Sequence, residues 1–289
     1  MKTDNTLLIF STVYFFFIYL IGMLVNTVII VVICLDPHLH TPMYLFLCNL
    51  SVVDISYTTV TIPKLLYILF SGNNLVPFTQ CLSQMYFMLQ AASAEVNILF
   101  IMAYDRYVAI CHPLHYYHIL SKKICILIII IIWIGGGVNS SLITMSVLKF
   151  IFCSATIHQF FCEAKALLNI SCGGTEMFYI VFYAEYLVFG LCPVMCNLMS
   201  YVKIIRIIQR IKSKDGRRKV FSTCSSHLIV MAIYYGSAVS VYLTPPSDRY
   251  DLLEQILTIF YTTVVPMLNP LIYILRNKEV KKSFRKLLL

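Results

Sequence analysis

Two acidic residues of this 289-residue chain, Asp54 and Glu95, lie inside long apolar segments. Each is 11 residues from the inner end of its segment. At ~1.5 Å per helical residue both lie roughly 16 Å deep, near the middle of a bilayer core ~30 Å thick. Asn26 falls at a similar depth and Asn269 somewhat lower. Ionisable groups there normally face a bundle interior, so the four predict a shared sodium or proton site or a neutral hydrogen-bonded network. No other cofactor or metal is expected.

A second charged group, the pair Asp105–Arg106, lies where the third apolar segment ends. A guanidinium is costly to leave at the edge of the hydrocarbon unless it has a function or reaches the lipid interface. Two interpretations follow from this position. Either Arg106 pairs with Asp105 as part of a switch, or it is a snorkelling arginine.

The elements that must position these groups are membrane helices. The chain is 60% hydrophobic and 12% charged, whereas charged residues make up about a quarter of a soluble domain. Seven runs are long enough to span a bilayer, at about 7–34, 43–70, 81–106, 124–147, 177–202, 220–243 and 254–275. No linker divides them, so the sequence predicts one all-α membrane domain over 1–289. Residues 278–289 alternate basic and apolar positions, which predicts a short amphipathic helix.

The distribution of basic residues predicts the orientation. Of the 22 Lys and Arg residues, 17 fall on one side, most of them in 203–219 and 276–286. The N-terminus is therefore expected outside and the C-terminus inside. The formal charge of +9 reflects this bias and attraction to anionic lipid rather than nucleic-acid binding.

The outer side contains the residues suited to covalent modification. Seven of the eleven cysteines lie in spans or on the inner side, whereas Cys81, Cys153, Cys162 and Cys172 lie outside, where disulfides persist. Four cysteines allow three pairings, and the residues alone do not choose between them. Asn169 opens an Asn-Ile-Ser acceptor for glycosylation in the outer loop.

Several blocks in register resemble one receptor family. They are Leu39–Tyr44, Met102–Tyr116, Lys219–Leu228 and Pro266–Tyr273. Together they resemble the odorant-receptor family of class A (rhodopsin-like) G-protein-coupled receptors, and the resemblance covers nearly the whole chain. It implies a seven-helix bundle that binds a small, largely apolar odorant. It also implies a stimulatory, olfactory-type G protein as partner and a rise in cyclic AMP.

The resemblance also implies specific residue roles. It implies disulfides Cys81–Cys162, joining the outer loop to helix three, and Cys153–Cys172 within that loop. Asp54 and its polar neighbours are similar to the family's ion site.

The switch residues are also implied by the resemblance. Arg106 is expected to pair with Asp105 at rest and to be freed when helix six swings outward. Tyr201 and Tyr273 resemble the family residues that then pack against Arg106.

One or two helical turns further out, the positions expected to line the ligand pocket are mostly apolar with a few polar groups. They are Met85, Met88, Leu89, Ala92, Ser93, Glu185, Phe189, Tyr235, Ala238 and Tyr242. Glu185 is distinctive because no Lys or Arg lies at its level in helices three, five, six or seven. Its partner is predicted to be either a ligand with a hydroxyl or amine group or the neighbouring helices.

Two other classes of function are less well supported. An enzyme is not expected, because no metal motif or nucleophile elbow is present and the buried carboxylates lack a His or Ser constellation. An ion-coupled transporter or channel that uses Asp54 and Glu95 would predict internal repeats or interrupted helices in matching halves. The sequence has neither.

Overall fold

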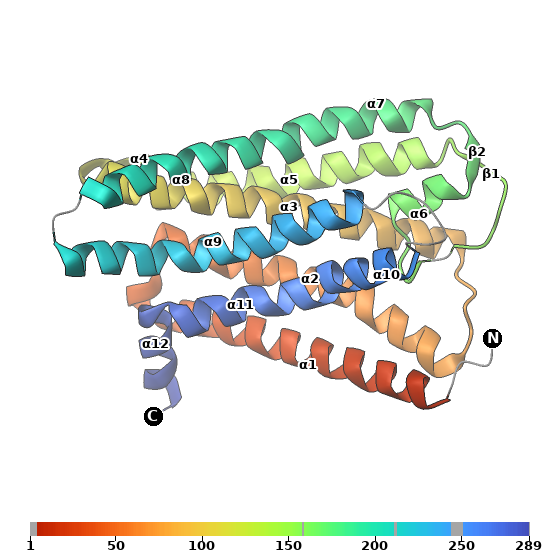
Figure 1. The fold of residues 1–289 in the computed structure, drawn as a ribbon, viewed down its shortest axis with the longest axis horizontal. Helices are drawn as coiled ribbons and strands as arrows, with labels where there is room; N and C mark the ends of the chain where they lie inside the picture. The colour runs from red at the N-terminus through yellow and green to blue at the C-terminus, as the bar shows by residue number, and fades with distance from the viewer. Residues whose placement is uncertain (1–4, 158, 211–212, 244–250, 289) are drawn as a thin grey trace.

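The protein is a bundle of long helices that run along one common direction (Figure 1). The computed structural model describes residues 5–288 apart from 158, 211–212 and 244–250. The long helices are α1 (Asn5–Leu35), α2 (Pro42–Ser71), α3 (Phe78–Cys111), α5 (Lys122–Val147), α7 (Glu176–Glu185), α8 (Cys192–Arg210), α9 (Lys214–Leu243), α10 (Asp251–Ile259) and α11 (Val265–Arg276). The π-helical turns Tyr186–Leu191 and Phe260–Val264 join α7 to α8 and α10 to α11. The predicted seven-helix bundle is confirmed.

The predicted spans fall within these helices, and the helices extend past them. The third span, 81–106, lies inside α3. Among the described residues, six helices are long and apolar enough to cross a membrane: Leu8–Leu35, Pro42–Ser71, Phe78–Cys111, Lys122–Val147, Glu176–Arg210 and Gln255–Ile274. The sixth predicted span, 220–243, lies in α9, many of whose side chains are outside the described part.

Local sequence sets several helix ends. Pro42 begins α2, where a missing N–H costs nothing because the first turn has no acceptor for it. The helix ends at Gly72, whose φ of 65° is left-handed and therefore suits glycine. Ser121 caps α5 by accepting a hydrogen bond from the amide of Ile124 at 3.5 Å.

The helices are apolar on both sides. Phe46, Leu50 and Ile98 are fully buried between helices, whereas Phe10 and Leu24 on α1 are more than half exposed. Exposed apolar surface on this scale marks a membrane-facing protein. The buried face therefore positions the polar groups of the interior, and the exposed face meets lipid.

The outer end of the bundle, as defined by the predicted orientation, contains the N-terminus and the loop after α5 (Figure 1). This loop forms β1 (Ile151–Phe152), α6 (Ala164–Asn169) and β2 (Ser171–Gly173), with β1 and β2 antiparallel. Disulfides join Cys81 to Cys162 and Cys153 to Cys172, the pairing that the family resemblance implies. Asn169 is exposed at the end of α6, as a glycosylation acceptor must be.

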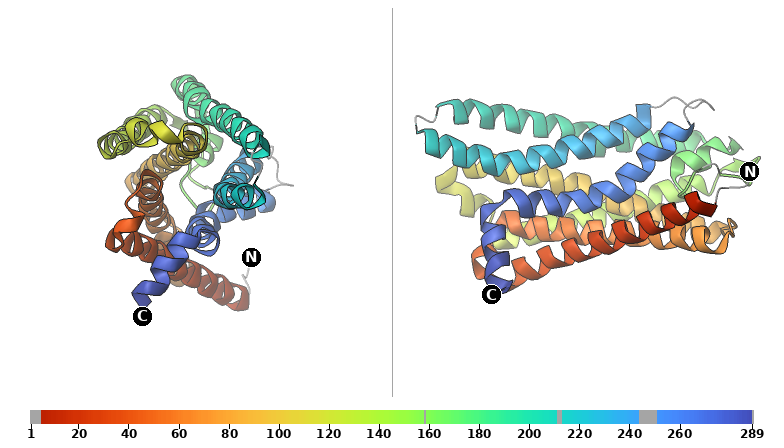
Figure 2. Two further views of the ribbon diagram at one scale, coloured as in Figure 1. Left: turned by 90° about the vertical axis from the view of Figure 1, so that its left-hand side faces the viewer. Right: turned by 60° about the horizontal axis from the view of Figure 1, so that its bottom comes forward.

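The inner end contains α4 (Tyr116–Ile119) and α12 (Lys278–Leu288), and α12 runs across the bundle rather than along it (Figures 1 and 2). The predicted amphipathic helix is thus present. Ser283 of α12 donates a 2.5 Å hydrogen bond to Asp36, which follows α1. Tyr44 of α2 donates to Asn277 at 3.3 Å. These contacts hold α12 against the first inner loop.

Candidate functional site

The two acidic residues near the middle of the bundle meet at one amide. Nδ2 of Asn269 on α11 lies 3.2 and 3.5 Å from the two carboxylate oxygens of Asp54 on α2 and 3.1 Å from Oε1 of Glu95 on α3. All three residues are at most 2% exposed. An amide nitrogen has only two hydrogens, so the three contacts share two donated protons. Three helices therefore meet at a cluster with more acceptors than donors.

This donor set fits a proton or a small hard cation. Carboxylate and carbonyl oxygens are the ligands that such cations prefer. Oδ1 of Asn269 is buried without a hydrogen-bond partner among the described residues, so a third oxygen is available beside the two carboxyls. The described part of the chain has no group of three His, Cys, Asp or Glu residues that could hold a metal. A monovalent ion or a proton is therefore a better match than a transition metal.

Asn26 has a different partner from the one that its depth suggested. Its Nδ2 donates to the carbonyl of Pro266 at 3.2 Å and to that of Gly22 at 3.0 Å. Pro270 has no N–H, so the Pro266 carbonyl four residues earlier lacks its usual helical donor. Asn26 supplies that donor and thereby joins α1 to α11.

At the inner end of α3, the Asp105–Arg106 pair is closed. Nη2 and Nε of Arg106 lie 2.7 and 3.0 Å from the same oxygen, Oδ2 of Asp105. The other oxygen, Oδ1, accepts a 2.6 Å hydrogen bond from the hydroxyl of Tyr116 on α4. Asp105 is completely buried. Its charge is matched by the guanidinium and both of its oxygens are hydrogen-bonded.

Tyr116 was missed as a site residue by the sequence reasoning. Burial, followed by the nearby charge of Asp105, raises the pKa of its hydroxyl, which therefore stays a donor. The available indication was its place in the same family-like block as Arg106. What was missing was the fold of the inner loop, which turns Tyr116 back onto α3.

Tyr201, the predicted switch residue on α8, is bonded to His227 on α9. The Tyr201 hydroxyl lies 2.5 Å from Nδ1 of His227, and Nε2 lies 3.1 Å from the carbonyl of Leu99. A carbonyl can only accept, so Nε2 carries the proton, and in the neutral ring Nδ1 then accepts from Tyr201. His227 thus links α3, α8 and α9, a role that the sequence reasoning did not assign to it.

Tyr273, the other predicted switch residue, lies buried on α11. Its hydroxyl has no hydrogen-bond partner among the described residues. A buried hydroxyl without a partner is unfavourable by about 1–3 kcal/mol. Tyr273 is therefore a group that gains from a rearrangement giving it a partner.

The five predicted ligand positions on α3 differ in burial. Met85, Met88 and Ser93 are buried, and Leu89 and Ala92 are half-buried. Met85 packs with apolar residues of the outer loop and α7, beneath the disulfide-bonded loop. The Ser93 hydroxyl is buried and has no hydrogen-bond partner within the described residues. The α3 wall is therefore apolar with one polar group, in keeping with a small-molecule site.

The remaining predicted ligand positions are only partly described. The Tyr235 side chain is half-buried, and its hydroxyl accepts a 3.2 Å hydrogen bond from Asn197 of α8. The side chains of Phe189, Ala238 and Tyr242 lie outside the described residues. Tyr235 therefore connects α8 to α9 on the level below the outer loop.

Glu185 has a partner within the protein. Nδ2 of Asn139 on α5 donates to Oε1 of Glu185 at 2.7 Å. The prediction weighed Lys and Arg in helices three, five, six and seven and did not identify the buried amide of Asn139 on α5. Two partners were predicted for Glu185, a ligand or the neighbouring helices, and the described contact is with a neighbouring helix.

The bundle matches known receptors in fold. It superposes on squid rhodopsin with a TM-score of 0.79, covering 99% of this chain and 86% of that one at 13% sequence identity. This likeness shows the fold, that of a rhodopsin-like seven-helix membrane protein.

The family follows from closer relatives. The olfactory receptor family model matches residues 15–289. Olfactory receptor 1 of Rattus norvegicus is 41% identical over 274 residues, covering 94% of this chain and 87% of its own length. Olfactory receptor 9G9 of Homo sapiens is 42% identical over 287 residues, covering 99% and 94%. The chain belongs to the olfactory receptor family of class A G-protein-coupled receptors, which are multi-pass membrane receptors and not enzymes.

Proposed function

We propose that this chain is a plasma-membrane receptor for small, largely apolar odorants that activates a stimulatory, olfactory-type G protein and raises cyclic AMP. It acts as a single seven-helix domain with its N-terminus outside. The observation that carries the proposal is the closed Asp105–Arg106–Tyr116 cluster at the inner end. This end also contains most of the Lys and Arg residues. Family membership favours a receptor over an ion-coupled transporter or channel.

In this proposal, activation exchanges the hydrogen-bond partners of the switch residues at the inner end of the bundle. At rest Asp105 holds Arg106, and His227 holds the Tyr201 hydroxyl. Outward movement of α9 carries His227 away from Leu99 and Tyr201, so the Tyr201 hydroxyl loses its resting partner and becomes free to pack against Arg106. Tyr273, already without a partner among the described residues, then gains one. A ligand drives this change only by binding the active arrangement more tightly.

The central cluster is the proposed ion site. A sodium ion would lie among the carboxyls of Asp54 and Glu95 and the free Oδ1 of Asn269, and would supply the positive charge that their shared amide lacks. Two buried carboxyls at one site do not both ionise without such a charge. Its occupancy couples to activation because α2, α3 and α11 all contribute to it.

The odorant is proposed to lie between the outer loop and Tyr235, against the apolar wall of α3. Ser93 and Tyr235 are two of the described polar groups on that level. This placement requires a ligand that is mostly hydrocarbon with at most one or two polar atoms.

The experiment is an odorant screen in cells with a cyclic AMP reporter and the olfactory G protein. An agonist of the wild type should give no response above background with Arg106→Ala, while surface labelling of the receptor persists. Arg285→Ala, which removes an exposed guanidinium from α12, is the matched control and should respond normally. A full response from Arg106→Ala would contradict the assignment of Arg106. Odorant responses without any change in cyclic AMP would contradict the G-protein type.

A further inference from the structure

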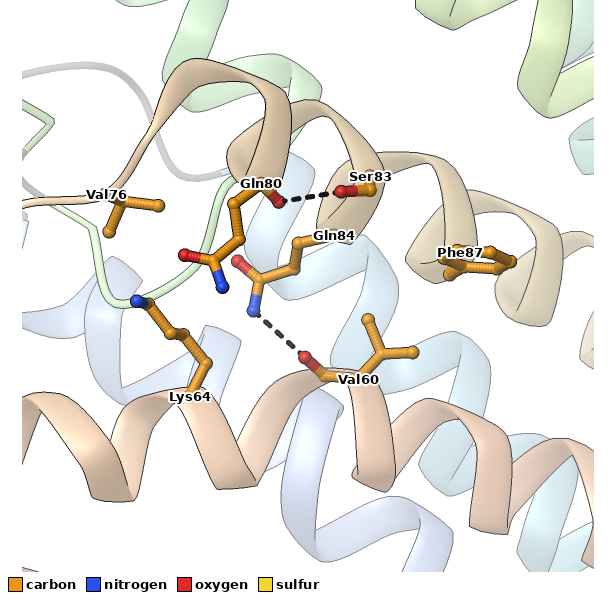
Figure 3. Close-up of a pocket in the computed structure, with 7 residues that line it drawn as sticks. All are labelled: Val60, Lys64, Val76, Gln80, Ser83, Gln84 and Phe87. Carbon is orange, nitrogen blue, oxygen red and sulfur yellow. Dashed lines mark hydrogen bonds between the residues drawn. The ribbon is translucent and has the colours of Figure 1, made fainter.

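A pocket of about 230 Å³ lies between the outer halves of α2 and α3, away from the predicted odorant positions (Figure 3). It is lined by Val60, Lys64, Val76, Gln80, Ser83, Gln84 and Phe87. Three of the seven residues are apolar, and the others supply one cationic side chain, two carboxamides and one hydroxyl. Enclosed sites for drug-sized molecules usually measure ~300–1,000 Å³, so this pocket takes only part of a larger molecule.

Lys64 is the charged group of this pocket. It lies on α2 seven residues before Ser71, so its backbone is roughly 10 Å below the outer end of that helix. Its ammonium is 4.9 Å from the centre of the Tyr67 ring. No carboxylate of the described residues lies within ion-pair distance of it, because the two ion pairs found there involve Asp36 and Asp105. An ammonium at this depth is stabilised by an anion.

The two glutamines of the pocket have different roles. Gln84 is committed to the protein, because its Nε2 donates to the carbonyl of Val60 at 3.0 Å and its Oε1 accepts from the amide of Cys162 at 3.0 Å. Gln80, one turn further out, has an exposed side chain with no hydrogen bond to another described residue. Figure 3 shows the Gln80 carboxamide and the Lys64 ammonium directed toward the same space. Together they offer N–H donors and a positive charge.

We propose that this pocket binds the carboxylate head of a long-chain fatty acid from the outer leaflet. The carboxylate lies between Lys64 and Gln80, accepting hydrogen bonds from both. The acyl chain leaves past Val60 and Phe87, which is half exposed on the outside of α3. A small anionic head matches the limited volume, and a single chain matches an apolar wall that opens to lipid. The site is distinct from both the odorant region and the central ion site.

The rival explanation is a snorkelling lysine without an occupant, which reaches the head-group region by its own flexible stem. A snorkelling lysine would attract any anionic lipid at the interface, whatever its chain. The proposal requires a carboxylate and a contact with the pocket walls. The fatty-acid site and the snorkelling lysine therefore predict different results when lipids with different head groups are cross-linked to the receptor. They differ in which lipid reacts and in which residues it labels.

The test uses the whole receptor in phosphatidylcholine nanodiscs with a long-chain fatty acid that carries a photoreactive diazirine on its chain. Peptide mass spectrometry locates the label. The acid should label peptides containing Val60–Lys64 or Val76–Phe87, and its methyl ester should label them at least tenfold less. Lys64→Gln should reduce labelling by the acid tenfold or more, whereas Lys64→Arg should retain it. Lys149→Gln, which removes an exposed lysine of the outer loop, should leave it unchanged.

Each variant is first checked for its unfolding temperature and for labelling of a lipid-exposed site elsewhere, so that misfolding is not mistaken for loss of the site. Equal labelling by acid and ester, or full labelling of a folded Lys64→Gln, would overturn the proposal. Adding phosphatidylglycerol at the mole fraction of the acid should leave the labelling intact. If phosphatidylglycerol at this mole fraction displaced the fatty acid, the pocket would bind phosphate head groups. That result would overturn the fatty-acid assignment.

Discussion

The two buried carboxylate clusters of this bundle differ in how their charge is balanced. At the inner end, Asp105 receives two N–H bonds from a guanidinium and one O–H bond from Tyr116. At the centre, Asp54 and Glu95 share the two protons of one neutral amide, that of Asn269. The acidic residues of both clusters are almost completely shielded from solvent. One is a closed ion pair, and the other has carboxyls without a cationic partner among the described residues.

This difference suggests two ways in which a membrane bundle can use a buried acid. A paired acid resists change, because removing its partner leaves an uncompensated charge, which costs several kcal/mol. An unpaired acid must bind a proton or an ion, so its state follows the surroundings. The inner cluster is therefore suited to holding the resting state, and the central cluster to sensing an ion.

Breaking the closed cluster should have the largest effect. Asp105→Asn removes the charge that holds Arg106, and charge-assisted hydrogen bonds contribute about 1.5–3 kcal/mol, so ligand-independent cyclic AMP should rise about tenfold or more. Tyr116→Phe removes only the third bond to Asp105 and should give a smaller rise. Basal cyclic AMP per surface receptor measures both. An unchanged basal level in Asp105→Asn would show that this ion pair does not hold the resting state.

Neutralising the central cluster should have the next largest effect. If one sodium ion binds the resting receptor there, a tenfold increase in sodium shifts the agonist concentration for half response by at most about tenfold. Asp54→Asn and Glu95→Gln should each reduce that shift. The measurement is a set of agonist dose–response curves in sodium and in choline at constant ionic strength. A sodium shift that survives in both variants would favour the neutral hydrogen-bonded network.

A third acid, Glu185, sharpens the comparison because its described partner, Asn139, is neutral. Glu185→Gln converts a charge-assisted hydrogen bond into a neutral one, a loss of about 1 kcal/mol or up to about fivefold in response. Because the bond joins two helices, matched alcohol, amine and hydrocarbon agonists should all shift alike. Asn139→Ala should reproduce the pattern. A shift confined to the alcohol and amine would instead assign Glu185 to ligand contact.

The smallest effect is expected at the contact between α12 and the first inner loop. Hydrogen bonds from Ser283 and then His38 lower the pKa of Asp36. A carboxyl whose folded pKa lies below its unfolded value of about 3.9 stabilises the fold above that value, and the contribution disappears as pH falls through the folded pKa. Ser283→Ala should therefore lower the unfolding temperature by roughly 1–2 °C, equally from pH 5 to pH 8. Ser56→Ala, which removes a hydroxyl that donates to the Val52 carbonyl of its own helix, is the control. A difference that varies across this range would exclude the Asp36 contact as its cause.

The sequence by itself determined the class of fold, because spanning a bilayer requires long apolar segments that are visible in composition. It also placed Asp54 and Glu95 at one depth, since a helix advances by a constant rise per residue. Depth is one coordinate along the bundle axis. Depth alone does not identify the partner of a polar side chain, as Asn26 shows. Asn26 has a similar predicted depth, but it donates to the Pro266 carbonyl of α11 rather than to the carboxyls.

Only the tertiary structure decided which of these polar groups meet. Asn269 and Asp54 are 215 residues apart, and Glu185 and Asn139 are 46 apart. Hydrogen bonds require atoms to approach within about 3.5 Å. That approach depends on the rotation of each helix about its own axis, which packing against neighbouring helices sets. Tyr116 reaches Asp105 and His227 reaches Tyr201 for the same reason, so the partners of the proposed switch residues come together only once the bundle has assembled.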